Sequence, residues 1–155
     1  MDVRRRAVAG ALGGAGATFV LSGLRWTWNW MGIVFDTAPT QVVDRAEEVF
    51  TREGFSPVTR RVLAVVAHFG YGTGIGAALG LLRRSTGERN VEAAVGSALG
   101  ILAWGAGWAS WLPLTGVHSP PWKQRTPKVL LPVIDHAVFG AAWGLLYSAL
   151  SRDRY

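Results

Sequence analysis

An acidic and a basic side chain lie next to each other inside an apolar stretch near the C-terminus. Asp135 and His136 directly follow the apolar residues 130–134. An ionised carboxylate near the centre of a bilayer costs at least about 2.5–3.5 kcal/mol, so Asp135 needs a partner, water or a proton. Histidine titrates near neutral pH, and intramembrane carboxylates commonly mark ion pathways. This pair is therefore the first candidate for chemistry.

Two further residues extend the candidate site. His68 lies in another apolar stretch, and Arg25 ends the first one. We expect an intramembrane polar site formed by His68, Asp135, His136 and Arg25. One interpretation is a proton-responsive or solute-binding site. The other is structural: the two histidines hydrogen-bond across helices, and Asp135 holds Arg25 or a loop amide. The residues alone leave both open.

An aromatic face is the second candidate. Trp104, Trp108 and Trp111 recur at i, i+4 and i+7, which places them on one side of a helix. Such a face anchors a helix at the membrane boundary, and it also offers stacking to a pigment, a quinone or a lipid tail. No cofactor is predicted, although a bound lipid or pigment fits this face.

Several classes of chemistry are excluded by what the sequence lacks. There is no cysteine, and hence no disulfide, thiolate metal site or cysteine nucleophile. No phosphate-binding glycine loop, nucleophile elbow or H-E-x-x-H motif is present. No metal ligand spacing recurs, so no metal site is predicted. The sequence therefore favours a protein that is not an enzyme.

The elements that carry these residues are long apolar segments. Half of the residues are hydrophobic and only 17% are charged, which is poor in charge for a water-soluble domain. We predict an all-α polytopic membrane protein, a single membrane domain over residues 1–155, with a short amphipathic helix and a proline-containing loop at 113–128. The transmembrane helices are expected at about 7–28, 57–83, 91–112 and 129–150, and the amphipathic helix at about 40–52.

Basic residues predict the orientation. Each side of the expected membrane carries eight Lys and Arg residues, but those at the N-terminus, the second loop and the C-terminus are packed into short segments. Short juxtamembrane segments dominate the positive-inside rule, so both termini should be cytoplasmic in a bacterial inner membrane. Because the basic residues cluster at helix ends rather than along one face, nucleic acid is not an expected partner.

The second and fourth apolar segments share a pattern. His68, Tyr71, Gly72 and Gly76 match equivalent residues at a constant offset of 68 positions, and residues 7–13 match 94–100 at an offset of 87. We predict two parallel repeats, helices 1-2 and helices 3-4. Small residues at one-turn spacing let helices approach closely. The packing glycines are Gly72, Gly76, Gly80, Gly96, Gly100, Gly140 and Gly144.

Residues of these same segments resemble the YagU-like bacterial inner-membrane proteins, a family defined by a domain of unknown function. The resemblance covers about residues 67–144: His68 with its aromatic and glycines, the Trp-rich third segment ending in Pro113, a Gly-Pro-Pro-Trp cluster at 116–122, and His136 with Gly140. It implies a small multispanning inner-membrane protein, with a link of the type member to acid tolerance and no assigned catalytic residue.

Two functions follow as expectations. The first is a non-enzymatic scaffold or accessory subunit of a larger membrane complex, whose partners are the lipid bilayer and other membrane subunits or copies of itself. The alternative is a small channel or transporter for protons or a small solute, with the polar site at the repeat interface.

Overall fold

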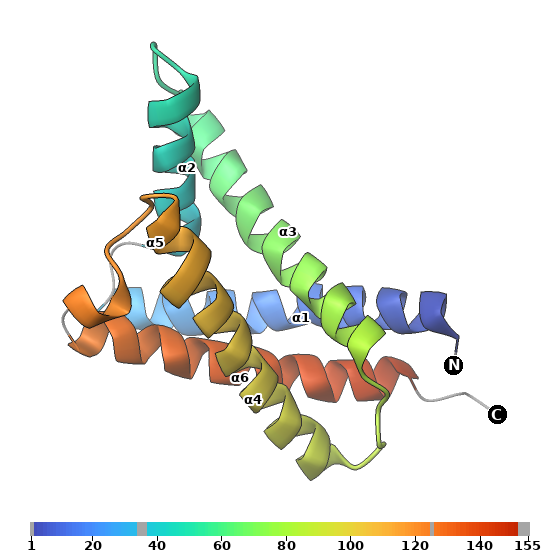
Figure 1. Cartoon of the computed structure of the whole chain (residues 1–155). Coiled ribbons are helices and arrows are strands. Elements are labelled where there is room, and N and C mark those ends of the chain that lie inside the picture. The colour runs from blue at the N-terminus through green and yellow to red at the C-terminus, as the bar shows by residue number, and fades with distance from the viewer. Residues whose placement is uncertain (1, 34–36, 125, 152–155) are drawn as a thin grey trace.

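A computed structural model of the chain describes residues 2–33, 37–124 and 126–151. Within these ranges the structure is helical, and four stretches are long and apolar enough to cross a membrane, as predicted. A shorter helix, α2, lies beside α3 (Figure 1). The elements are α1 (Val3–Trp30), α2 (Ala38–Phe50), α3 (Pro57–Leu82), α4 (Arg89–Ala106), the π-helix η1 (Gly107–Trp111), α5 (Leu112–Leu114), the 3₁₀-helix η2 (Pro121–Lys123) and α6 (Thr126–Ser151).

Local chemistry explains where α3 begins and is compatible with the early start of α6. The Ser56 hydroxyl accepts a hydrogen bond from the Thr59 amide at 3.1 Å, and Pro57 takes the first helical position, where no amide hydrogen is needed. Helix α6 begins at Thr126, before the predicted residue 129. A proline in the first turn loses no intrahelical hydrogen bond, so Pro127 does not prevent this earlier start.

Helices α1 and α3 cross at glycines. A Cβ atom built on Gly76 would lie 2.7 Å from the Cα atom of Gly14, and one on Gly80 would lie 3.0 Å from the Cα atom of Gly10. Any side chain at these positions would meet backbone that cannot move aside. The glycines therefore set the distance between the two helices.

Helices α4 and α6 cross in the same manner. A Cβ atom on Gly100 would lie 3.0 Å from the Cα atom of Gly140, and one on Gly96 would lie 3.3 Å from that of Gly144. Two glycine-mediated crossings thus organise the four long helices.

An apolar core joins the two crossed pairs through α1 and α6. Trp143 and Tyr147 are fully buried and stacked, with ring centroids 5.1 Å apart. The indole of Trp143 donates to the Gly10 carbonyl of α1 at 3.2 Å, and the Tyr147 hydroxyl donates to the Arg83 carbonyl at the end of α3 at 2.7 Å. Aromatic residues of α6 therefore satisfy backbone carbonyls of both α1 and α3.

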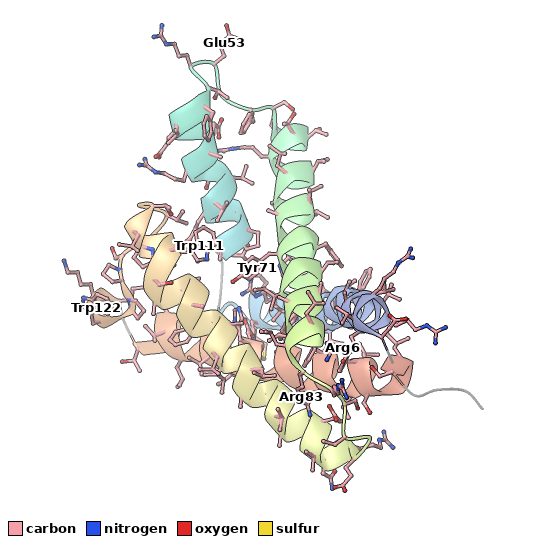
Figure 2. All side chains as sticks on the ribbon, turned by 45° about the vertical axis from the view of Figure 1, so that its right-hand side comes forward. Arg6, Glu53, Tyr71, Arg83, Trp111 and Trp122 are labelled. Atoms are coloured by element: carbon pink, nitrogen blue, oxygen red, sulfur yellow. The ribbon has the colours of Figure 1, made fainter. Side chains whose placement is uncertain are left out.

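The turn between α3 and α4 is held by a buried carboxylate that the sequence did not single out. Glu92 is 0% exposed and pairs with Arg83, which is labelled in Figure 2. Its other oxygen accepts from the Ser85 hydroxyl at 3.0 Å and from both the amide and the hydroxyl of Thr86. Because a buried charge needs such partners, Glu92 fixes the turn at 83–88.

Helix α2 is amphipathic and packs along the first half of α3. Arg60 of α3 forms ion pairs with Asp44 at 2.9 Å and with Glu47 of α2. Arg45 donates to the Thr115 carbonyl at 3.1 Å, which ties α2 to the segment after α5. The helix thereby lies between the first half of α3 and the segment around α5 (Figure 1).

Candidate functional site

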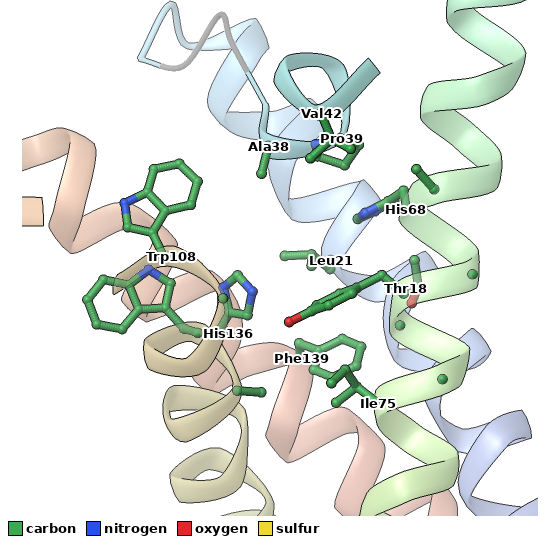
Figure 3. Close-up of a pocket in the computed structure, with 18 of the residues that line it drawn as sticks. Thr18, Leu21, Ala38, Pro39, Val42, His68, Ile75, Trp108, His136 and Phe139 are labelled. Atoms are coloured by element: carbon green, nitrogen blue, oxygen red, sulfur yellow. The ribbon is translucent and has the colours of Figure 1, made fainter. Parts of the chain in front are cut away.

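A cavity of about 600 Å³ lies between α3 and the α4–η1 segment. Helices α1 and α6 contribute Leu21 and Phe139 to it, and the first turns of α2 contribute Pro39 and Val42 (Figure 3). Its size is within the range of about 300–1,000 Å³ that is typical of small-molecule sites. The residues that matter below are Arg25, His68, Tyr71, Trp104, Trp108, Trp111, His136 and Phe139.

One side of the cavity is open. Helices α3 and α4 do not pack along their lengths, and in the view of Figure 2 they move apart from their connecting turn. Lining residues on this side are themselves exposed, including Gly70, Gly74, Tyr71 and Trp111. A Cβ atom on Gly70 or Gly74 would meet nothing within 4 Å. The gap between the two helices is therefore an entrance to the cavity.

Aromatic rings form much of the wall. Trp104, Trp108 and Trp111 all line the cavity, although the last two lie on the π-helix η1, which the sequence did not predict. Tyr71 of α3 faces Trp111 with ring centroids 6.4 Å apart (Figure 2). A Cβ atom on Gly107 would lie 3.1 Å from the Tyr71 hydroxyl oxygen, so this glycine leaves room for the tyrosine. The aromatic walls suit a flat apolar molecule.

Asp135 is engaged on both of its oxygens. Arg25 donates from Nε to Oδ2 at 3.1 Å, and the Trp28 indole donates to Oδ1 at 3.0 Å. The side chains of Asp135 and Arg25 are only 5% and 14% exposed. Arg25, Trp28 and Asp135 thus form a buried polar clasp between α1 and α6. This agrees with the structural interpretation, in which Asp135 holds Arg25.

His68 is oriented by a serine of α1. Its Nε2 atom lies 3.1 Å from the Ser22 hydroxyl oxygen, while that hydroxyl donates its single proton to the Thr18 carbonyl at 2.8 Å. With this hydroxyl donating to Thr18, its oxygen accepts from the ring, and we therefore assign the ring proton of His68 to Nε2. A neutral His68 then has its lone pair on Nδ1.

His136 is oriented by the backbone of its own helix. Its Nδ1 atom lies 2.7 Å from the Pro132 carbonyl oxygen, which can only accept, so Nδ1 carries the proton. A neutral His136 has its lone pair on Nε2. The structural interpretation expected both histidines to hydrogen-bond across helices. His68 does so to Ser22 of α1, whereas the partner of His136 is the Pro132 carbonyl of its own helix.

The structure divides the predicted polar site into two parts. Asp135 joins Arg25 in the clasp, while His68 and His136 lie on different sides of the cavity (Figure 3). Sequence reasoning missed Ser22, Trp28 and Tyr71 as partners. The spacing offers one signal: Ser22 and Trp28 lie three residues before and after Arg25, so all three share a helix face.

No metal centre is formed by the described residues, since no group of three or more His, Asp and Glu side chains comes together there. The packing glycines lie at the helix crossings, and Gly72 among them also lines the cavity.

Comparison with family models, with curated proteins and with solved structures found no match for this chain.

Proposed function

We propose that the protein is a non-enzymatic multi-pass membrane protein that binds a small hydrophobic molecule in the cavity. The observation that carries this proposal is the cavity itself, which has apolar and aromatic walls and opens between α3 and α4. In a bilayer this opening faces lipid, because the adjoining half of α3 exposes Val58, Val62, Val65 and Val66. A molecule dissolved in the membrane enters sideways without crossing water.

The alternative of a proton or solute transporter would use Asp135, His68 and His136. Both oxygens of Asp135 are occupied by Arg25 and Trp28, which favours a structural role for this carboxylate. A transporter also needs a path to both membrane surfaces, and the cavity residues lie nearer the α2 end than the turn at 83–88. We therefore rank binding above transport.

Three further expectations enter the proposal. We propose that both termini are cytoplasmic, and that the protein is a YagU-like inner-membrane protein that works as a scaffold or accessory subunit, or as a homo-oligomer.

We also propose two repeats, helices 1-2 and helices 3-4. Gly14 lies against Gly72 and Gly76 of α3, and Gly96 lies against Gly140 and Gly144 of α6. These contacts support an alignment of the two repeats that pairs Gly14 with Gly96, whereas the sequence pattern paired Gly13 with Gly100.

The test is recovery of a bound molecule. The protein is purified in mild detergent, its intact mass is recorded by native mass spectrometry, and extracted small molecules are identified. We expect one defined hydrophobic species in near-stoichiometric amount. The intact mass separately reports partner subunits or self-association.

A matched pair of variants ties the molecule to the cavity. Gly74→Trp fills the entrance and should abolish recovery, whereas Gly23→Trp should leave it unchanged. Both glycines are exposed and helical, and a Cβ atom on either would meet nothing within 4 Å, but only Gly74 lines the cavity. Equal recovery from both variants, or no bound species in the unmodified protein, contradicts the proposal.

A further inference from the structure

The chemistry of the molecule follows from two ring nitrogens, and this inference rests on the proposed function. Nδ1 of His68 and Nε2 of His136 have no hydrogen-bonding partner in the described part of the chain. Both residues line the cavity. An occupant is therefore in a position to satisfy them.

The hydrogen-bond network fixes what these nitrogens can do. His68 donates a hydrogen bond from Nε2 to the Ser22 hydroxyl, and His136 donates one from Nδ1 to the Pro132 carbonyl. In their neutral forms the imidazoles of these two cavity-lining residues therefore each keep a lone pair without a partner among the described residues, and both can act as acceptors. A complementary molecule must supply donors, and hydroxyl groups are the donors that an otherwise apolar molecule most readily carries.

The charges around the cavity favour a neutral molecule. Arg25 is the one lining residue with a permanent charge among those described, and Asp135 neutralises it at 3.1 Å. An anion or a cation entering here would lose its hydration without gaining a free counter-ion.

We propose that the cavity holds a neutral lipid of the quinol class, with a flat aromatic ring, two hydroxyl groups and an apolar chain. The hydroxyl groups donate to His68 Nδ1 and His136 Nε2. The ring lies among Tyr71, the tryptophans and Phe139, and the chain leaves through the gap between α3 and α4. The oxidised quinone carries carbonyl acceptors only, so it meets the two lone pairs unfavourably and binds less tightly.

Three probes of nearly equal size test this proposal on the unmodified protein in lipid nanodiscs. They are a benzoquinol with one isoprenoid unit, its quinone, and the same molecule with both hydroxyl groups replaced by hydrogen. Calorimetric titration under reducing, oxygen-free conditions for the quinol should show it binding about tenfold or more tighter than the other two, as expected when a ligand pairs with otherwise unpaired acceptors in an apolar cavity.

Two variants locate the effect. His68→Phe and His136→Phe keep an aromatic ring but remove the acceptor, so each should weaken quinol binding about tenfold while leaving the hydrogen-substituted probe unaffected. Equal affinity of the unmodified protein for quinol and hydrogen-substituted probe overturns this inference and leaves the proposed function standing. Failure to bind any of the three probes also overturns this inference, whereas the proposed function is contradicted only if no bound species is recovered from the purified protein.

Discussion

At the scale of single residues, the polar groups inside the apolar bundle fall into two kinds. Some have all of their hydrogen bonds made by the protein, and others keep an atom without a partner. Asp135 and Glu92 are nearly or fully buried, and every oxygen of each has a donor from the chain. The two histidines each keep one nitrogen unused. This contrast is why we assign stability to the carboxylates and recognition to the imidazoles.

Removing the charge of Asp135 should reveal its structural role. Asp135→Asn leaves Arg25 buried without a counter-ion, which should lower the free energy of unfolding by about 3–5 kcal/mol. The control is Asp44→Asn, which breaks an ion pair whose side chains are both 46% exposed and should cost under about 1 kcal/mol. Thermal unfolding of both variants in one detergent makes the comparison. Equal losses would contradict the clasp.

The sequence predicted part of this residue-level picture. Its apolar surroundings marked Asp135 as a group in need of a partner, and Arg25 was among the candidates. Both histidines were expected to bond across helices, but His136 bonds within its own helix, because matching sequence positions do not reveal which hydroxyl or carbonyl lies nearer. Glu92 was missed because it stands at the start of a helix, where a carboxylate ordinarily faces water.

At the scale of helices, glycine determines how the elements meet. The apolar segments and the Ser56–Pro57 start could be predicted, since they depend on composition and local capping. The π-helix at 107–111 could not, because one widened turn leaves no periodic signal over so few residues. It places Trp108 and Trp111 on the cavity wall beside Trp104.

A pair of alanine substitutions on α3 should have opposite effects. Gly76→Ala places a methyl group against the Gly10 carbonyl and 2.7 Å from the Gly14 Cα atom, so it should destabilise the protein by about 1–3 kcal/mol or more. Gly74→Ala, half a turn away, meets nothing within 4 Å and should stabilise α3 by up to about 1 kcal/mol.

Thermal unfolding and the elution profile in detergent report both effects. A Gly76→Ala protein as stable and as uniform in size as the Gly74→Ala protein would show that α1 and α3 do not cross at these glycines.

At the scale of the whole molecule, the start of α1 and the end of α6 lie away from α2 (Figure 1). Arg4, Arg5, Arg6, Arg83 and Arg84 belong to this end, whereas the α2 end carries acidic residues beside its basic ones. In the proposed orientation, which follows the positive-inside rule, the cavity lies in the half of the bundle nearer the non-cytoplasmic surface.

Cysteine labelling tests this orientation directly, because the chain has no cysteine of its own. In intact cells, Glu53→Cys in the α2–α3 connection should react with a membrane-impermeant maleimide. Glu88→Cys in the α3–α4 turn should react only after the cells are opened. Both positions are exposed, so the difference reports sidedness. Labelling of Glu88→Cys from outside would reverse the proposed topology.

The gap between α3 and α4 has a consequence for how occupancy is controlled. A molecule that enters through this gap equilibrates with the pool dissolved in the bilayer, so its mole fraction among the lipids sets the fraction of protein occupied. Aqueous concentration then matters only through partitioning. A site whose affinity, expressed as a mole fraction among the lipids, is weak is still occupied when its molecule is an abundant membrane constituent. Its occupancy falls when metabolism depletes that pool.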